Sequence, residues 1–167
     1  MKSEITINKE YIEWLKDIKD KILRSQLKAA VRLNSELLLL YWELGASIVE
    51  KQLKSKWGDG LIKQLSKDLQ SEFSNIKGFS ETNLKYIRKW YLFYNRENTI
   101  SQQAVDQLPA TKSQQAVDLI IPNQLASIPW GHHIQILTKC NSFNEALFYI
   151  QKTLENNWSR NVLLHQI

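Results

Sequence analysis

The side chains with the clearest potential for chemistry lie between residues 80 and 96. On a helical wheel of about 100° per residue, one side of this segment is apolar. That side holds Leu84, Ile87, Trp90, Tyr91 and Tyr94. The opposite side holds four cations, Lys85, Arg88, Lys89 and Arg96. Lysine and arginine can contact the phosphates of nucleic acids, and arginine also pairs with guanine edges. The pattern therefore predicts a helix that buries aromatics and can present cations to DNA.

The polar residues that begin this segment add a second set of candidates. Ser80, Thr82 and Asn83 lie at the expected helix start, where they can approach phosphates or base edges. Asparagine in particular can pair with adenine. A stripe of lysine and arginine is also typical of a solvated helix face, so the pattern leaves a purely structural interpretation open. The DNA-binding candidates are Ser80, Thr82, Asn83, Lys85, Arg88, Lys89 and Arg96.

The elements around these residues favour a helix-turn-helix or winged-helix-like core. Ser80 is a good N-cap, and Glu81 suits the positive end of a helix that should run to about Tyr94. Leu61, Leu65, Leu69 and Phe73 predict a preceding helix. The connection between the two is longer than the usual three- to four-residue turn. We therefore expect residues 61–96 to form a helix-turn-helix-like pair.

The distribution of charge supports the same segment. The chain of 167 residues has a net charge of +5, and residues 61–96 contain seven basic and three acidic side chains. Most of the positive excess is thus concentrated in one short segment. A basic segment of this kind permits an anionic partner, and DNA is the partner that we expect.

Tests for catalytic and metal sites give no candidate. There is no glycine-rich phosphate loop and no G-x-S-x-G motif, and a single cysteine, Cys140, excludes an intrachain disulfide. His132 and His133 are adjacent, so their side chains point about 100° apart on a helix. We expect one of them to be a buried imidazole rather than a metal ligand. Asp17-Ile18-Lys19 fits the letters of a nuclease motif but lies in helical sequence. We predict no catalytic residue, metal or cofactor in this chain.

The first third of the chain predicts one long helix, or an antiparallel pair, from Lys9 to about Lys54. Apolar residues recur at helical spacing through Ile22 and again from Leu33 to Ile48. Gly45 interrupts the pattern, which indicates the close approach of a neighbouring helix. The apolar content exceeds what one stripe needs. This excess supports an alternative function, a dimerisation or protein-interaction domain that does not contact nucleic acid.

The remaining segments complete an all-α fold with three regions, 1–96, 97–128 and 129–167. Residues 97–128 contain a duplicated hexapeptide, at 101–106 and 113–118, and predict a variable surface loop. Residues 129–167 predict three helices, with Ser142 and Ser159 as N-caps of the last two. The final helix stops in the middle of its apolar pattern, which suggests a larger protein. We expect these regions to form one compact domain.

Neither a secretory signal nor a membrane span is predicted. Residues 1–11 lack an apolar stretch, and the most apolar run, from Leu37 to Val49, has only 13 residues. A transmembrane helix needs about 20 residues. We expect a soluble, cytoplasmic protein without a membrane partner.

Several separated motifs together resemble one bacterial family. These motifs are Leu40-Tyr41-Trp42-Glu43-Leu44-Gly45, Leu65-Ser66-Lys67-Asp68-Leu69, Gly78-Phe79-Ser80 with Asn83-Leu84, and Trp130 with His132, Phe148-Tyr149 and Trp158-Ser159-Arg160 with Leu163 and Ile167. In this order they resemble the N-terminal domain of YhcG-type proteins, whose full-length members are predicted PD-(D/E)xK nucleases. The resemblance covers nearly the whole chain except residues 97–128.

The resemblance implies a domain that precedes a nuclease domain and binds DNA through a helix-turn-helix or winged-helix-like element. The nuclease half is absent from this chain. The leading hypothesis is thus a non-catalytic DNA-targeting module whose partners are DNA and a C-terminal nuclease domain, with a homodimer as a further possibility.

Overall fold

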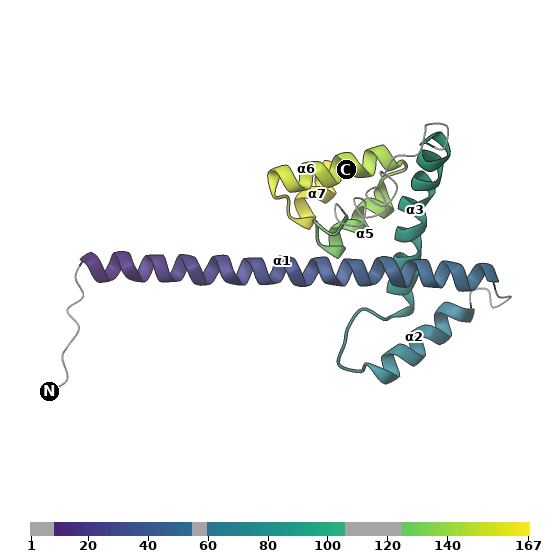
Figure 1. Ribbon diagram of the computed structural model, residues 1–167, viewed down its shortest axis with the longest axis horizontal. Helices are drawn as coiled ribbons and strands as arrows, with labels where there is room; N and C mark the ends of the chain where they lie inside the picture. The colour runs from purple at the N-terminus through teal and green to yellow at the C-terminus, as the bar shows by residue number, and fades with distance from the viewer. Residues whose placement is uncertain (1–8, 55–59, 106–124) are drawn as a thin grey trace. The chain divides into compact units, whose positions relative to one another are not determined.

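The computed structural model describes residues 9–54, 60–105 and 125–167, and the side chains of all of these except residues 96–105. The described residues form helices and no strand. The helices are α1 (Lys9–Lys54), α2 (Gly60–Glu72), α3 (Glu81–Val105), α5 (Trp130–Lys139), α6 (Phe143–Asn156) and α7 (Arg160–Gln166) (Figure 1). The predicted all-α fold is therefore confirmed. The first third of the chain is a single helix rather than an antiparallel pair.

The chain divides into two units, Met1–Leu33 and Asn34–Ile167. The described part of the first unit is the beginning of α1, from residue 9 to residue 33. The second unit contains the rest of α1 and all the other helices. Within it, α2 contacts α3, and α3 contacts both α5 and α6. The three C-terminal helices also contact one another through α5 (Figure 1).

Trp90, on α3, is at the centre of the core of the second unit. Its ring lies edge-on to those of Trp42 and Trp130, with centroids 5.4 Å away in both cases. The ring of His133 is 5.2 Å away. Edge-to-face pairs of this kind stabilise aromatic cores beyond the area that they bury. One tryptophan therefore joins helices that are widely separated in sequence.

Gly45 lies where α1 passes close to α3. An alanine Cβ at this position would lie 2.7 Å from Cβ of Tyr91 and 3.0 Å from the backbone oxygen of Ile87. The absence of a side chain thus lets the two helices approach, as the sequence predicted. Further along α1 towards its N-terminus, Asn34 and Ser35 donate hydrogen bonds to the Ala126 carbonyl oxygen, at 3.4 and 3.2 Å.

The contact at Gly45 makes a stability prediction. Alanine favours a helix interior over glycine by about 1 kcal/mol, but overpacking costs roughly 1–3 kcal/mol. Because the clash involves Cβ of Tyr91 and backbone, which cannot move freely, we expect Gly45→Ala to lower the free energy of unfolding by up to about 2 kcal/mol in urea titrations. Gly60→Ala is the control, since its Cβ would meet no atom within 4 Å. Equal or greater stability of Gly45→Ala would contradict the close packing.

The connection between α2 and α3, residues 73–80, is held by side chains of α2. Ser66 and Gln70 donate hydrogen bonds to the Phe79 carbonyl oxygen, at 2.8 and 3.1 Å. Gly78 has a φ of 116°, and a Cβ there would collide with the Tyr41 hydroxyl. Glycine is favoured at this position for both reasons. The start of α3 is therefore fixed by contacts with α1 and α2.

α3 is longer than the sequence predicted. It continues beyond Tyr94 to Val105, so residues 97–105 of the expected loop are helical. Residues 106–124, which include the second copy of the hexapeptide, lie outside the described residues. At the other end of the expected loop, Leu125, Ala126 and Ile128 are buried in the core.

The C-terminal helices begin where the sequence predicted. The hydroxyl of Ser142 accepts a hydrogen bond from the Glu145 amide, and that of Ser159 accepts one from the Val162 amide, both at 3.3 Å. Both predicted N-caps are thus confirmed. Across the described residues, no helix combines the length and the apolarity that crossing a membrane requires.

Candidate nucleic-acid interface

The two sides of α3 are separated as the helical wheel predicted. Leu84, Ile87, Trp90 and Tyr94 are all buried. Tyr91 is half-buried, and its ring packs against Trp42 with centroids 4.9 Å apart. Lys85 and Lys89 are exposed on the other side, whereas Arg88, about 40° from Leu84 on the wheel, is partly buried at the boundary between the two sides. The backbone of α3 thus holds the candidate cations in a defined register.

The predicted cations on α3 have different surroundings. Lys85 is exposed, and its Nζ lies 2.7 Å from Oε1 of Glu81, one helical turn earlier. Lys89 is exposed along its stem and donates a hydrogen bond of 2.8 Å to the Leu137 carbonyl oxygen. Arg88 is partly buried, and its Nε has no hydrogen-bond partner. The side chain of Arg96 lies outside the described residues.

Two lysines influence the carboxyl group of Glu81 at the start of α3. The hydrogen bond and charge of Lys85, with a further contribution from the charge of Lys63, lower the pKa of this carboxyl below its usual range. The effect of Lys63 places a cation of α2 near the start of α3. The ion pair itself is exposed, and pairs of this kind contribute little to stability. Lys85 can therefore exchange Glu81 for a phosphate at small cost.

Two of the three predicted polar residues at the start of α3, Ser80 and Asn83, make hydrogen bonds within the fold. The Ser80 hydroxyl accepts a hydrogen bond from the Asn83 amide at 3.3 Å, so Ser80 is the N-cap. The Asn83 side chain donates to the Gly78 carbonyl at 2.6 Å and accepts from the Trp130 indole at 2.8 Å. A contact between Asn83 and adenine would require these bonds to break. Thr82 is exposed.

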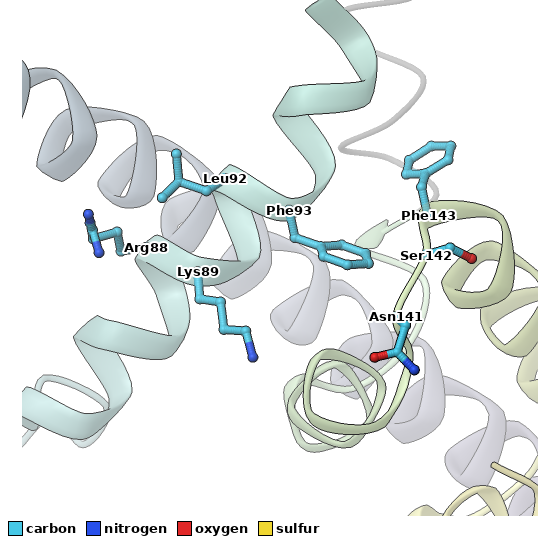
Figure 2. Close-up of a pocket in the computed structure, with 7 residues that line it drawn as sticks. All are labelled: Arg88, Lys89, Leu92, Phe93, Asn141, Ser142 and Phe143. Atoms are coloured by element: carbon cyan, nitrogen blue, oxygen red, sulfur yellow. The ribbon is translucent and has the colours of Figure 1, made fainter. Parts of the chain in front are cut away.

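A groove of about 460 Å³ lies between α3 and the connection from α5 to α6. Figure 2 shows Lys89 and Phe93 extending from α3 towards Asn141, whereas Arg88 points away from it. The groove is lined by Arg88, Lys89, Leu92, Phe93, Asn141, Ser142 and Phe143. Lys89 therefore extends along one concave surface, which also contains the N-cap of α6, and Arg88 lies at its edge.

Two cations on α2 were not included among the predicted site residues. Lys63 and Lys67 are exposed, and together they line a second shallow surface with Gln64 and Gln70. Their spacing of four residues, opposite the Leu61–Phe73 stripe, is the sequence signal that identifies them. Exposed cations therefore lie on α2 as well as on α3.

The histidines and the cysteine are structural groups in this fold. The sequence predicted one buried imidazole, but His132 and His133 are both buried. The ring of His132 contacts the Trp158 carbonyl oxygen at 2.9 Å, and that of His133 contacts the Leu125 carbonyl oxygen at 2.6 Å. These two contacts, across 26 residues for His132 and eight for His133, account for the difference, because each ring has its own partner.

Cys140 is also buried. Burial, together with the nearby charge of Glu145, raises the pKa of its thiol to about 11. The thiol is thus protonated at neutral pH and is a poor nucleophile. Among the described residues, no three His, Cys, Asp or Glu side chains are grouped to hold a metal ion.

The fold and the site define an all-helical domain with a basic helix packed over an aromatic core. Residues 17–167 match the DUF1016 N-terminal domain, and this chain belongs to that family. It is similar to "Putative nuclease YhcG" of Escherichia coli (strain K12), with 30% identity over 146 residues. The match covers 80% of this chain and 38% of that protein, so the chain spans about two fifths of its relative. No solved structure matches the chain. The resemblance stated from the motifs is confirmed.

Proposed function

We propose that this domain is a non-catalytic module that binds DNA and positions a nuclease domain. The observation that carries the proposal is the register of α3, whose buried aromatic side leaves Lys85 and Lys89 exposed on the other side, with Arg88 at the boundary. What supports a nuclease as the associated activity is the match to the N-terminal part of a protein named as a nuclease. In this proposal, cleavage belongs to a domain outside this chain.

The binding mode is contact with the phosphate backbone. Lys85 exchanges its exposed partner Glu81 for a phosphate, and the partly buried Arg88 supplies a guanidinium at the edge of the same side. Lys63 on α2 adds a further cation near the start of α3. In this proposal, α2 and α3 act as a helix-turn-helix-like pair, with Thr82 as the exposed residue that approaches bases. Asn83 positions the start of α3 through its bonds to Gly78 and Trp130.

Removing the cations of α3 tests this mode. We expect the triple variant Lys85→Ala, Arg88→Ala, Lys89→Ala to bind duplex DNA roughly 10- to 100-fold more weakly at about 50 mM salt. The slope of log affinity against log salt should fall by roughly one unit for each lost phosphate contact. Fluorescence anisotropy of a labelled duplex at several salt concentrations measures both quantities.

A matched control removes the same number of charges elsewhere. Lys51→Ala, Lys54→Ala, Lys152→Ala takes away three cations, two of which have exposed ion-pair partners on their own helices, as Lys85 has. This control should bind DNA almost as well as the parent. If both triple variants lose affinity equally, DNA binding depends on the net charge of the domain and not on a site on α3. If the α3 variant binds like the parent, this face is not the site.

A further inference from the structure

The first part of α1 presents an apolar face. Between residues 9 and 33, Ile22 and Leu33 are 51% and 74% exposed. Leu23 and Leu27 are exposed as well, but they lie about 100° and 140° around the helix from Ile22. These residues belong to the first unit of the chain. Large exposed apolar surface on one element indicates an interaction site.

Six of the apolar residues of this segment form a regular seam. Spacings of four, three, four, seven and four residues place them within about 60° on a helical wheel. A seam with spacings of three and four is the pattern of paired helices. Only Ser25 and Gln26, at the centre of the seven-residue step, interrupt it. The members of the seam are Tyr11, Leu15, Ile18, Ile22, Ala29 and Leu33.

The charges along the segment are unevenly distributed: residues 9–20 carry a net charge of −1, because Lys9, Lys16 and Lys19 accompany four acidic residues, whereas residues 21–33 carry +4. All its acidic residues lie in the first half, from residue 9 to residue 20. These are Glu10, Glu13, Asp17 and Asp20. The second half, from residue 21 to residue 33, holds four bases and no acid. These are Lys21, Arg24, Lys28 and Arg32. A helix with this polarity complements a copy of itself that runs in the opposite direction.

We propose that residues 9–33 of two copies of this chain pair in antiparallel, centred on Ile22. This register places Tyr11 opposite Leu33 and Leu15 opposite Ala29, so the seam is buried against itself. A parallel pair would instead place the basic half of one helix beside the basic half of the other. The charge distribution therefore selects the antiparallel arrangement.

The same register brings opposite charges together towards both ends of one flank, whereas Lys21, near its centre, lies beside Lys21 of the second copy. Glu10 and Asp17 lie on the same side of the seam as Lys28 and Arg32, by their positions on the helical wheel. In the antiparallel pair, Glu10 lies beside Arg32 and Asp17 beside Lys28 of the second copy. None of these four residues has an ion-pair partner among the described residues. Flanking charges of this kind set the orientation of paired helices.

Cysteine cross-linking tests both the pairing and its direction. Ile22→Cys should form a disulfide-linked dimer under mild oxidation. Leu15→Cys and Ala29→Cys should each remain uncross-linked alone but form a heterodimer when the two variants are mixed. The parent chain gives the background, because its single cysteine, Cys140, is buried. Efficient cross-linking of Leu15→Cys alone would show a parallel pair and overturn the proposed register.

Sedimentation measures the assembly without cross-links and without DNA. The parent should be a dimer. The double variant Lys28→Glu, Arg32→Glu should have a dimer dissociation constant at least tenfold higher. Glu10→Lys with Asp17→Lys should do the same, and an equal mixture of the two double variants should recover the dimer. A parent that is monomeric at about 100 μM in low salt, where ion pairs are strongest, would refute the proposal whatever its DNA binding.

Discussion

Replacing Trp90 with alanine is expected to lower the free energy of unfolding by about 4 kcal/mol, within the range for large aromatic deletions from a core. The side chain is buried, and its ring contacts those of Trp42, Trp130 and His133. Its indole also donates a hydrogen bond of 3.2 Å to Nδ1 of His133. The variant thus leaves both a cavity and a buried acceptor without a donor. Since domains are stable by only about 5–15 kcal/mol, this loss is a large fraction of the total free energy of unfolding.

Urea titrations followed by circular dichroism measure this change. Phe148→Ala is the matched control, because Phe148 is an aromatic residue of the same unit that is 53% exposed. Its loss should change the free energy of unfolding by less than about 1 kcal/mol. Trp90→Phe should fall between the two, since it keeps most of the ring but loses the hydrogen bond. Parent-like stability of Trp90→Ala would show that the aromatic core is not as described.

Lowering the pH is expected to destabilise the domain through His133. Trp90 can only donate, so Nδ1 of His133 is the acceptor and Nε2 carries the proton that bonds to the Leu125 carbonyl oxygen. Protonation of Nδ1 would turn it into a second donor facing the Trp90 indole N–H, and the hydrogen bond would be lost. Burial, together with the nearby His132, lowers the pKa of His133 from 6.5 to about 4, although its bond to Leu125 opposes this shift.

The sign of the effect follows from proton binding in the two states. Between about pH 6.5 and pH 4, the unfolded chain binds a proton that the folded chain does not. The contribution of neutral His133 to the free energy of unfolding is therefore fully present above pH 6.5 and decreases as the pH falls towards 4. The shift corresponds to about 3 kcal/mol at 1.36 kcal/mol per unit. Unfolding midpoints in urea at several pH values between 7 and 4 measure the loss.

A variant that does not titrate isolates His133 from the carboxylates. Gln can accept from Trp90 and donate to the Leu125 carbonyl, so His133→Gln should have a flatter pH profile than the parent. His165→Gln, at an exposed histidine, should follow the parent profile. Glu50 and Glu155, whose pKa values are lowered by Lys54 and Lys152, contribute equally to all three proteins. Identical profiles for His133→Gln and the parent would exclude His133 as the cause.

Local patterns were sufficient to predict much of the fold. The period of the apolar residues identified the buried side of α3, because Leu84, Ile87 and Trp90 need only helical geometry to share a face. The caps at Ser80, Ser142 and Ser159 were equally predictable, since an N-cap bonds to an amide three residues away. Gly45 gave a correct indication of close packing.

Features that depend on distant contacts were not predictable in the same way. From the sequence, Asn83 is a polar residue at a helix start that could contact a base. In the structure its side chain bonds to Trp130, which is 47 residues away in sequence. Likewise, the burial of both His132 and His133 depends on carbonyl groups of Trp158 and Leu125. The same limit applies to the candidate site, where the proximity of Lys63 to Glu81 follows from the packing of α2 on α3.

The central claim is that this domain binds DNA through the basic side of α3. The most direct test titrates the parent chain against labelled duplex, branched and single-stranded DNA at two salt concentrations. We expect duplex binding that weakens steeply between about 50 and 200 mM salt, as phosphate contacts require. Absence of binding to all three DNAs at about 50 mM salt, with the chain folded by circular dichroism, would contradict the claim.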